Sequence, residues 1–159
     1  MSFLTALLAI SSMVLPISPE IEISSDPALL DQETPIIVHH LVPGETIAVH
    51  AEAMDDNGTH WASFASFQAD CRRNVDLSTQ SPVNGTYSGT DPMGLFWSME
   101  GHSSATFTVR EEQIPIDLRV FRGNEEIAFR KIIRWKKSPD VKRVFLRDNG
   151  LVGVLFLPR

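Results

Sequence analysis

The chain has a single cysteine, Cys71, among its 159 residues. One thiol excludes an intramolecular disulfide and a cysteine-rich zinc site. The positive charges of Arg72 and Arg73 would favour a thiolate, but no histidine is near in sequence, so we interpret Cys71 as a surface turn residue. Stability must therefore come from packing.

Lysine and arginine are absent from residues 1–71, and residues 72–159 hold all fourteen of them. The net charge of −6 thus combines an acidic first half with a mildly basic second half. The basic residues are interspersed and lack interleaved aromatic side chains, so they make a poor nucleic-acid footprint. We expect no nucleic-acid partner. The apolar and charged contents, 43% and 21%, are those of an ordinary globular protein.

No apolar run is long enough to span a bilayer comfortably, and residues 3–17 fit the h-region of a secretory signal. No Lys or Arg precedes this run, and no A-x-A-like cleavage site follows it. Sequons at Asn57 and Asn84 are compatible with secretion, although Asn-Gly is also a turn dipeptide. Two interpretations of residues 1–19 stay open: a signal peptide or membrane anchor, or a mispredicted or frayed N-terminus.

Helical periodicity is scarce after this leader, and turn residues interrupt short alternating runs every eight to twelve positions, as in a β-sandwich. In the clearest run, Ile47, Val49, Ala51 and Ala53 share one face. The predicted strands are residues 20–24, 35–39, 46–54, 61–69, 105–109, 114–121, 127–135, 141–146 and 151–157, with tight turns at 55–58 and 122–125. Together they predict an all-β, immunoglobulin-like antiparallel β-sandwich, a single domain over residues 20–159.

Residues 84–99, NGTYSGTDPMGLFWSM, combine two glycine turns, a Pro-Met-Gly step and a Leu-Phe-Trp cluster. This segment resembles the signature VDL…GxYxGxxPMGLxWS of the N-terminal domain of the acyl-CoA thioester hydrolase / bile acid-CoA:amino acid N-acyltransferase family. The matching residues are Val75-Asp76-Leu77, Gly85, Tyr87, Gly89, Pro92-Met93-Gly94-Leu95 and Trp97-Ser98. The resemblance extends to residues 41–45 and 150–158, so it covers most of the chain.

The resemblance implies a β-sandwich, an intracellular location and an accessory role beside an α/β-hydrolase domain. In the family, a Ser or Cys of that second domain attacks an acyl-CoA thioester, and the acyl group passes to water or to an amino acid such as glycine or taurine. We expect the hydrolase domain and its triad to be absent from this chain, so no catalytic position is carried over.

The expected function is that of an N-terminal accessory domain of an acyl-CoA thioesterase or amino acid N-acyltransferase-like protein, not catalytic by itself. Its expected partner is the α/β-hydrolase domain, through which alone it would meet acyl-CoA, and self-association is a further expectation. Whether the chain is an enzyme stays open at this level.

A second interpretation belongs to another class: a secreted or anchored immunoglobulin-like module that binds a lipid or a protein partner through its aromatic cluster. The apolar leader and the two sequons favour it. Glycan on Asn57 or Asn84, together with a mature N-terminus near residue 18, would separate it from the first interpretation.

The sequence supplies no set of side chains for acyl transfer. Ser88 lies in G-x-x-S-G rather than G-x-S-x-G and precedes no helical pattern, so we interpret it as part of the structural motif. A metal site needs three or four convergent ligands, whereas the five histidines are scattered: His39, His40, His50, His60 and His102. We expect no catalytic residue, no metal site and no cofactor.

The Pro-Met-Gly-Leu-Phe-Trp segment presents more apolar surface than a loop normally shows. Two interpretations stay open: a plug that closes one end of the sandwich, or a docking surface for the hydrolase domain that also shapes the acyl-chain entrance. The candidate interface residues are Met93, Gly94, Leu95, Phe96 and Trp97. We expect a positive φ at Gly94 and exposure of at least two of the four side chains.

Overall fold

The computed structural model describes residues 17–101, 106–148 and 150–158, so most of the apolar leader lies outside the described residues. The described chain is nearly all β, which confirms the predicted class. The strands are β1 (Glu20–Ile23), β2 (Ala28–Leu29), β3 (Ile36–His39), β4 (Thr46–Met54), β5 (His60–Gln68), β6 (Val75–Asp76), β7 (Asn84–Gly85), β8 (Glu100–Gly101), β9 (Gln113–Arg122), β10 (Glu125–Trp135), β11 (Val141–Asp148) and β12 (Leu151–Pro158). One helical turn, α1 (Gly94–Trp97), interrupts them. Within these ranges no helix is long and apolar enough to cross a membrane.

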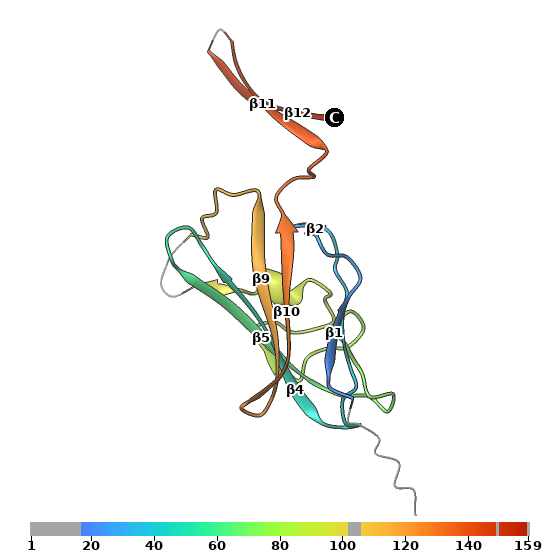
Figure 1. The fold of residues 1–159 in the computed structure, drawn as a ribbon. Coiled ribbons are helices and arrows are strands. Elements are labelled where there is room, and N and C mark those ends of the chain that lie inside the picture. The colour runs from blue at the N-terminus through green and yellow to red at the C-terminus, as the bar shows by residue number, and fades with distance from the viewer. Residues whose placement is uncertain (1–16, 102–105, 149, 159) are drawn as a thin grey trace, which may run out of the picture.

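The body of the molecule is built from two sheets (Figure 1). The larger has the strand order β2-β10-β9-β4-β5-β7, with β8 also paired to β5, and the smaller has the order β1-β3-β6. Neighbouring strands are antiparallel except β2 and β10, which are parallel. This arrangement is consistent with the predicted β-sandwich, and its immunoglobulin-like detail stays a prediction.

Strand β4 shows how alternation builds the core. Ile47, Val49, Ala51 and Ala53 are all buried, as predicted, because successive side chains of a strand point to opposite faces. Apolar residues of the smaller sheet complete the same cluster: Ile21, Ile36, Val38 and Val75. The Asn-Gly turn that follows β4 has the positive φ it requires, +76° at Gly58. Local pattern and local turn chemistry therefore agree with the fold here.

The predicted strand at residues 105–109 is wrong over its described part, which forms no strand. Its backbone bonds instead to the turn between β4 and β5, where the amide of Asp56 donates to the carbonyl of Thr108 at 2.9 Å. The Phe107 ring meets the Trp61 ring edge-on, with centroids 5.4 Å apart. These contacts tie the described part of the segment to the turn between β4 and β5.

Strands β11 and β12 form a hairpin that pairs only with itself and stands away from the body (Figure 1). Sequence analysis placed both strands in the sandwich, and the structure corrects that placement. β10 ends at Trp135, and residues 136–140 carry the chain off the larger sheet before β11 begins. Every residue of β12 is exposed, including its apolar ones.

Candidate functional site

The loop that leads into α1 depends on small residues and a carboxylate. A Cβ at Gly85 would lie 2.8 Å from Ala65 Cα, so β7 can approach β5 only with glycine there. Gly89 has a φ of +80°, which glycine adopts without strain. Asp91 Oδ1 accepts a hydrogen bond from the Met93 amide at 2.8 Å, which fixes the start of the helical turn.

Gly94 does not have the positive φ that we expected. It opens α1 in direct contact with the Tyr87 ring, where an added Cβ would lie 2.3 Å from Tyr87 Cε2. The glycine of the Pro-Met-Gly step is therefore required by close packing rather than by backbone conformation. This contact also explains the spacing between the tyrosine and the glycine in the signature.

The helical turn α1 divides the interface candidates between the interior and the surface. Leu95 is 2% exposed, and its carbonyl accepts a hydrogen bond from Ser63 Oγ at 2.5 Å. Met93 is buried as well, Phe96 is half-buried, and Trp97 is 63% exposed. The expectation of at least two exposed side chains is thus wrong, because, of these four side chains, Trp97 alone is exposed. The docking role of this segment stays a prediction.

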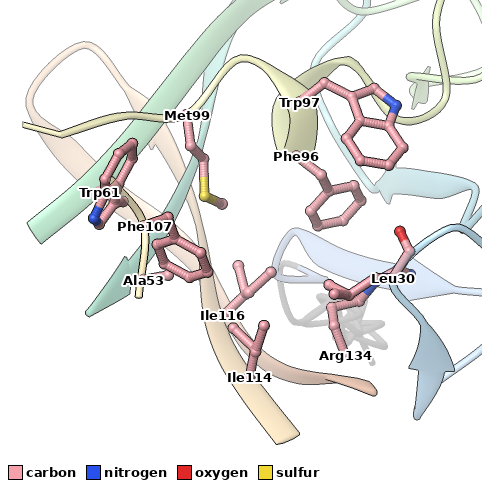
Figure 2. A pocket seen from close by; sticks show the side chains of 10 residues that line it. All are labelled: Leu30, Ala53, Trp61, Phe96, Trp97, Met99, Phe107, Ile114, Ile116 and Arg134. Carbon is pink, nitrogen blue, oxygen red and sulfur yellow. The ribbon is translucent and has the colours of Figure 1, made fainter. Parts of the chain in front are cut away.

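An apolar pocket of about 180 Å³ opens beside α1 (Figure 2). Phe96 and Trp97 of α1 line one side of it, facing Ile114 and Ile116 of β9, while Trp61 stands across from Arg134. The remaining lining residues are Leu30, Ala53, Met99 and Phe107. The pocket lies at the end of the larger sheet where β9 begins and β10 ends.

Arg134 is the charged member of this lining, and its side chain is 1% exposed. Its guanidinium donates to Thr34 Oγ1 and, through Nη2, to the carbonyls of Leu30 and Gln32 at 3.1 and 2.7 Å. The guanidinium carbon also lies 4.9 Å from the centroid of the Phe96 ring. No carboxylate of the described chain forms an ion pair with Arg134.

Burial shifts three titratable groups in and around the core. It lowers the pKa of Arg134, and the nearby charge of Asp31 only partly opposes this. It raises the pKa of Tyr87 to about 12, with a smaller contribution from Asp91. It also lowers the pKa of His50, whose ring lies 4.9 Å from that of Phe121. Burial is the largest cause of each shift, so the three shifts reflect packing.

The other residues weighed in the sequence are dispersed. Ser88 and Cys71 are both exposed. His39 bonds to Glu22 Oε2 at 2.7 Å and to Asn74 Oδ1 at 3.1 Å, which accounts for its position without a metal. The described ranges contain no cluster of three or more metal-ligating side chains, and His102 lies outside them.

Sequence analysis missed most of the pocket. Arg134 carried a usable signal, because it stands two residues after Ile132 in a strand and therefore shares its inward face. A charged residue in an inward register is unusual and marks a place to examine. Phe107 gave no such signal, because residues 105–109 were predicted to form a strand and not a segment that lines a pocket.

A family model and the curated relatives agree on the relationship of this chain to known proteins. The family model described as "Acyl-CoA thioester hydrolase/BAAT N-terminal region" matches residues 31–148. The chain is 31% identical to human bile acid-CoA:amino acid N-acyltransferase over 144 residues, which are 82% of this chain and 34% of that protein. It is 30% identical to mouse acyl-coenzyme A thioesterase 3 over 138 residues, 82% of this chain and 32% of that protein. It is 31% identical to rat acyl-coenzyme A thioesterase 1 over 136 residues, 80% of this chain and 32% of that protein. The chain thus spans about a third of the length of these curated relatives.

Proposed function

The chain belongs to the acyl-CoA thioester hydrolase/BAAT N-terminal family, and from this premise we propose that it is an accessory domain without catalytic machinery of its own. Its partner in this proposal is the α/β-hydrolase domain of an acyl-CoA thioesterase or an amino acid N-acyltransferase. Acyl transfer needs a nucleophile, a base that activates it and donors for the oxyanion. Ser88 and Cys71 are exposed, and neither has a hydrogen bond to a histidine in the described chain.

The hairpin β11–β12 is the main support for a contact with a second domain. Isolated two-stranded hairpins are only marginally stable in water, and contiguous exposed apolar surface marks an interaction site. Its exposed apolar side chains are Phe145, Leu146, Leu151, Val152, Val154, Leu155, Phe156 and Leu157. The match to the family's N-terminal region stops at the last residue of β11, so β12 lies beyond it. Both observations support assigning the hairpin to the contact with the second domain.

Trp97 extends the proposed docking surface on the body. It is the exposed end of α1, and it lines the pocket with Ile114, the second residue of β9. The hairpin follows β10, whose end lies beside the start of β9. Trp97 and the hairpin therefore belong to the same end of the larger sheet. The buried Met93, Gly94 and Leu95 support this surface from beneath and make no direct contact in the proposal.

The catalytic half of the proposal is tested by incubating the purified chain with palmitoyl-CoA and measuring free CoA. We expect no release above a heat-treated control. Release that Ser88→Ala or Cys71→Ala abolishes would overturn the proposal, because the chain would then be an enzyme by itself.

The docking half is tested by sedimentation of the purified chain at increasing concentration. An unpaired apolar hairpin should self-associate, and the variant with Val152→Thr and Phe156→Thr should shift the chain toward the monomer. A chain that stays monomeric at about 1 mM, a concentration at which even millimolar contacts form, would contradict an exposed docking surface.

A further inference from the structure

The pocket beside α1 combines an apolar lining with one buried cation. Nine of its ten lining residues are apolar, and the tenth is Arg134. Apolar pockets with a few converging polar groups are the usual form of a small-molecule site. The polar group here is a charge, which restricts the class of ligand.

No carboxylate of the described chain forms an ion pair with Arg134, although Asp31 lies near enough for its charge to act on the guanidinium. Its three oxygen acceptors are neutral: the Thr34 hydroxyl and the carbonyls of Leu30 and Gln32. The Phe96 ring and Met93 Sδ, 3.8 Å from Nη2, add only weak contacts. Buried charges in proteins are ordinarily paired, because transfer out of water is costly for an isolated ion. An anion that entered the pocket would supply the missing pair.

The size and shape of the pocket limit the apolar part of such a ligand. Its volume of about 180 Å³ is close to that of dry apolar cavities that accept a benzene-sized molecule. A chain on the order of six to eight carbons therefore fits, with the longer part of any larger ligand outside. Figure 2 shows Ile114 and Ile116 between Arg134 and the Trp61–Phe107 pair, so a ligand held at Arg134 would extend over apolar side chains.

We propose that this pocket binds a medium-chain aliphatic monocarboxylate, with its carboxylate on the Arg134 guanidinium and its chain along Ile114 and Ile116. This inference does not rest on the docking proposal, since every residue that carries it belongs to the body of the described chain. Both Nη2 hydrogens of Arg134 already donate to carbonyls, so the carboxylate would accept a single charge-assisted hydrogen bond, from Nε or from the remaining Nη1 hydrogen.

The experiment titrates octanoate into the full chain and follows tryptophan fluorescence, because Trp61 and Trp97 both line the pocket. Octanol and octylammonium, which share the chain and differ in the head group, are titrated in parallel. We expect saturable octanoate binding at least about tenfold tighter than octanol, the gain typical of one charge-assisted hydrogen bond. Octylammonium should bind more weakly than either.

Two variants locate the site without removing the hydrogen bonds of Arg134. Ala53→Leu adds bulk to the pocket wall and should abolish octanoate binding, whereas Val154→Phe adds bulk to the exposed hairpin and should leave it unchanged. The thermal midpoint of the wild-type chain should rise with octanoate concentration, by mass action, and that of Ala53→Leu should not.

Three results would overturn the proposal. Octanol binding as tight as octanoate would mean that Arg134 only holds the Leu30 and Gln32 carbonyls. Loss of octanoate binding in Val154→Phe but not in Ala53→Leu would place the ligand on the hairpin. Absence of saturable octanoate binding by the folded wild-type chain would leave the pocket without this ligand. None of these results bears on whether the chain packs against a hydrolase domain.

Discussion

The body and the hairpin β11–β12 are made from the same kind of sequence, yet they have opposite surroundings. In the body, the alternating residues of β4 pack against those of the smaller sheet and α1. In the hairpin, the apolar residues of β12 meet no second layer and all are exposed. Both regions therefore form strands. Among the described residues, it is the body in which a second layer covers the apolar side chains of those strands.

This difference shows that a segment can form secondary structure without gaining the stability that burial provides. A paired strand needs only local alternation and a turn, whereas the hydrophobic contribution, about 25 cal/mol per Å² of buried apolar area, requires a second surface. The hairpin forms paired strands, but within the described chain it lacks a second surface that would bury its apolar side chains. Matched substitutions in the two regions should accordingly have very different effects on unfolding.

The largest contrast is expected between two leucines. Leu95→Ala removes a side chain that is 2% exposed in the core and should lower the free energy of unfolding by about 2–5 kcal/mol. Leu155→Ala removes an exposed side chain of the hairpin and should change it by less than about 0.5 kcal/mol. Urea denaturation followed by tryptophan fluorescence measures both. Equal effects would show that the hairpin is packed on the body in solution.

Two glycines give the next contrast. Gly94→Val forces a side chain into the Tyr87 ring and should cost about 1–3 kcal/mol through overpacking. Gly153→Val is the control, since a Cβ there meets nothing within 4 Å and valine suits a strand. If Gly94→Val leaves the urea midpoint unchanged, the contact between Tyr87 and α1 is not as close as the structure has it.

Two ion pairs give a smaller contrast that depends on pH. Arg122 Nε donates to Glu45 Oε2 at 2.5 Å within the body, and this hydrogen bond holds the pKa of Glu45 below its ordinary value of 4.5. The folded state therefore gains stability that is present above pH 4.5 and is lost as pH falls through the lower folded-state pKa. Glu45→Gln should cost about 1 kcal/mol at pH 7, and this cost should shrink as the pH falls below 4.5.

The matched control for this pair joins the body to the hairpin. Glu112 Oε1 lies 3.7 Å from Arg143 Nη2, and both side chains are partly exposed. Glu112→Gln should leave the unfolding free energy unchanged at either pH, because exposed pairs contribute about 0–1 kcal/mol. A difference between wild type and Glu45→Gln that does not shrink as the pH is lowered from 7 would mean that the carboxylate charge is not its source.

The smallest expected effect on unfolding comes from polar residues on the hairpin. Leu151→Thr combined with Phe156→Thr should leave the urea midpoint of the body unchanged, since both side chains are exposed. The same variant should be more soluble than the wild type, because it removes apolar surface from an unpaired hairpin. Lower solubility, or a lower midpoint, would mean that these side chains are buried against the body.

The sequence by itself determined the longer strands, two of the turns and the family. Alternation assigned the buried face of β4, and Asn-Gly and Gly-Asn placed the turns at Gly58 and Gly123, which have positive φ as that chemistry requires. These features depend on neighbours in sequence, so sequence was sufficient. The signature in residues 84–99 likewise indicated the family before any geometry was known.

Tertiary structure decided which strands meet and what the signature does. Apolar strand-forming residues occur in both β4 and β12, and they contain no information on whether a second layer exists to cover a strand. Gly94 packs on Tyr87 within the signature, and the sequence alone did not distinguish this contact from a positive φ at the glycine. The hydrogen bonds of Arg134 to the Leu30 and Gln32 carbonyls join segments distant in sequence, so no local pattern specified them. The pocket is the clearest case, because its lining comes from several separate segments that only the packed sheets bring together.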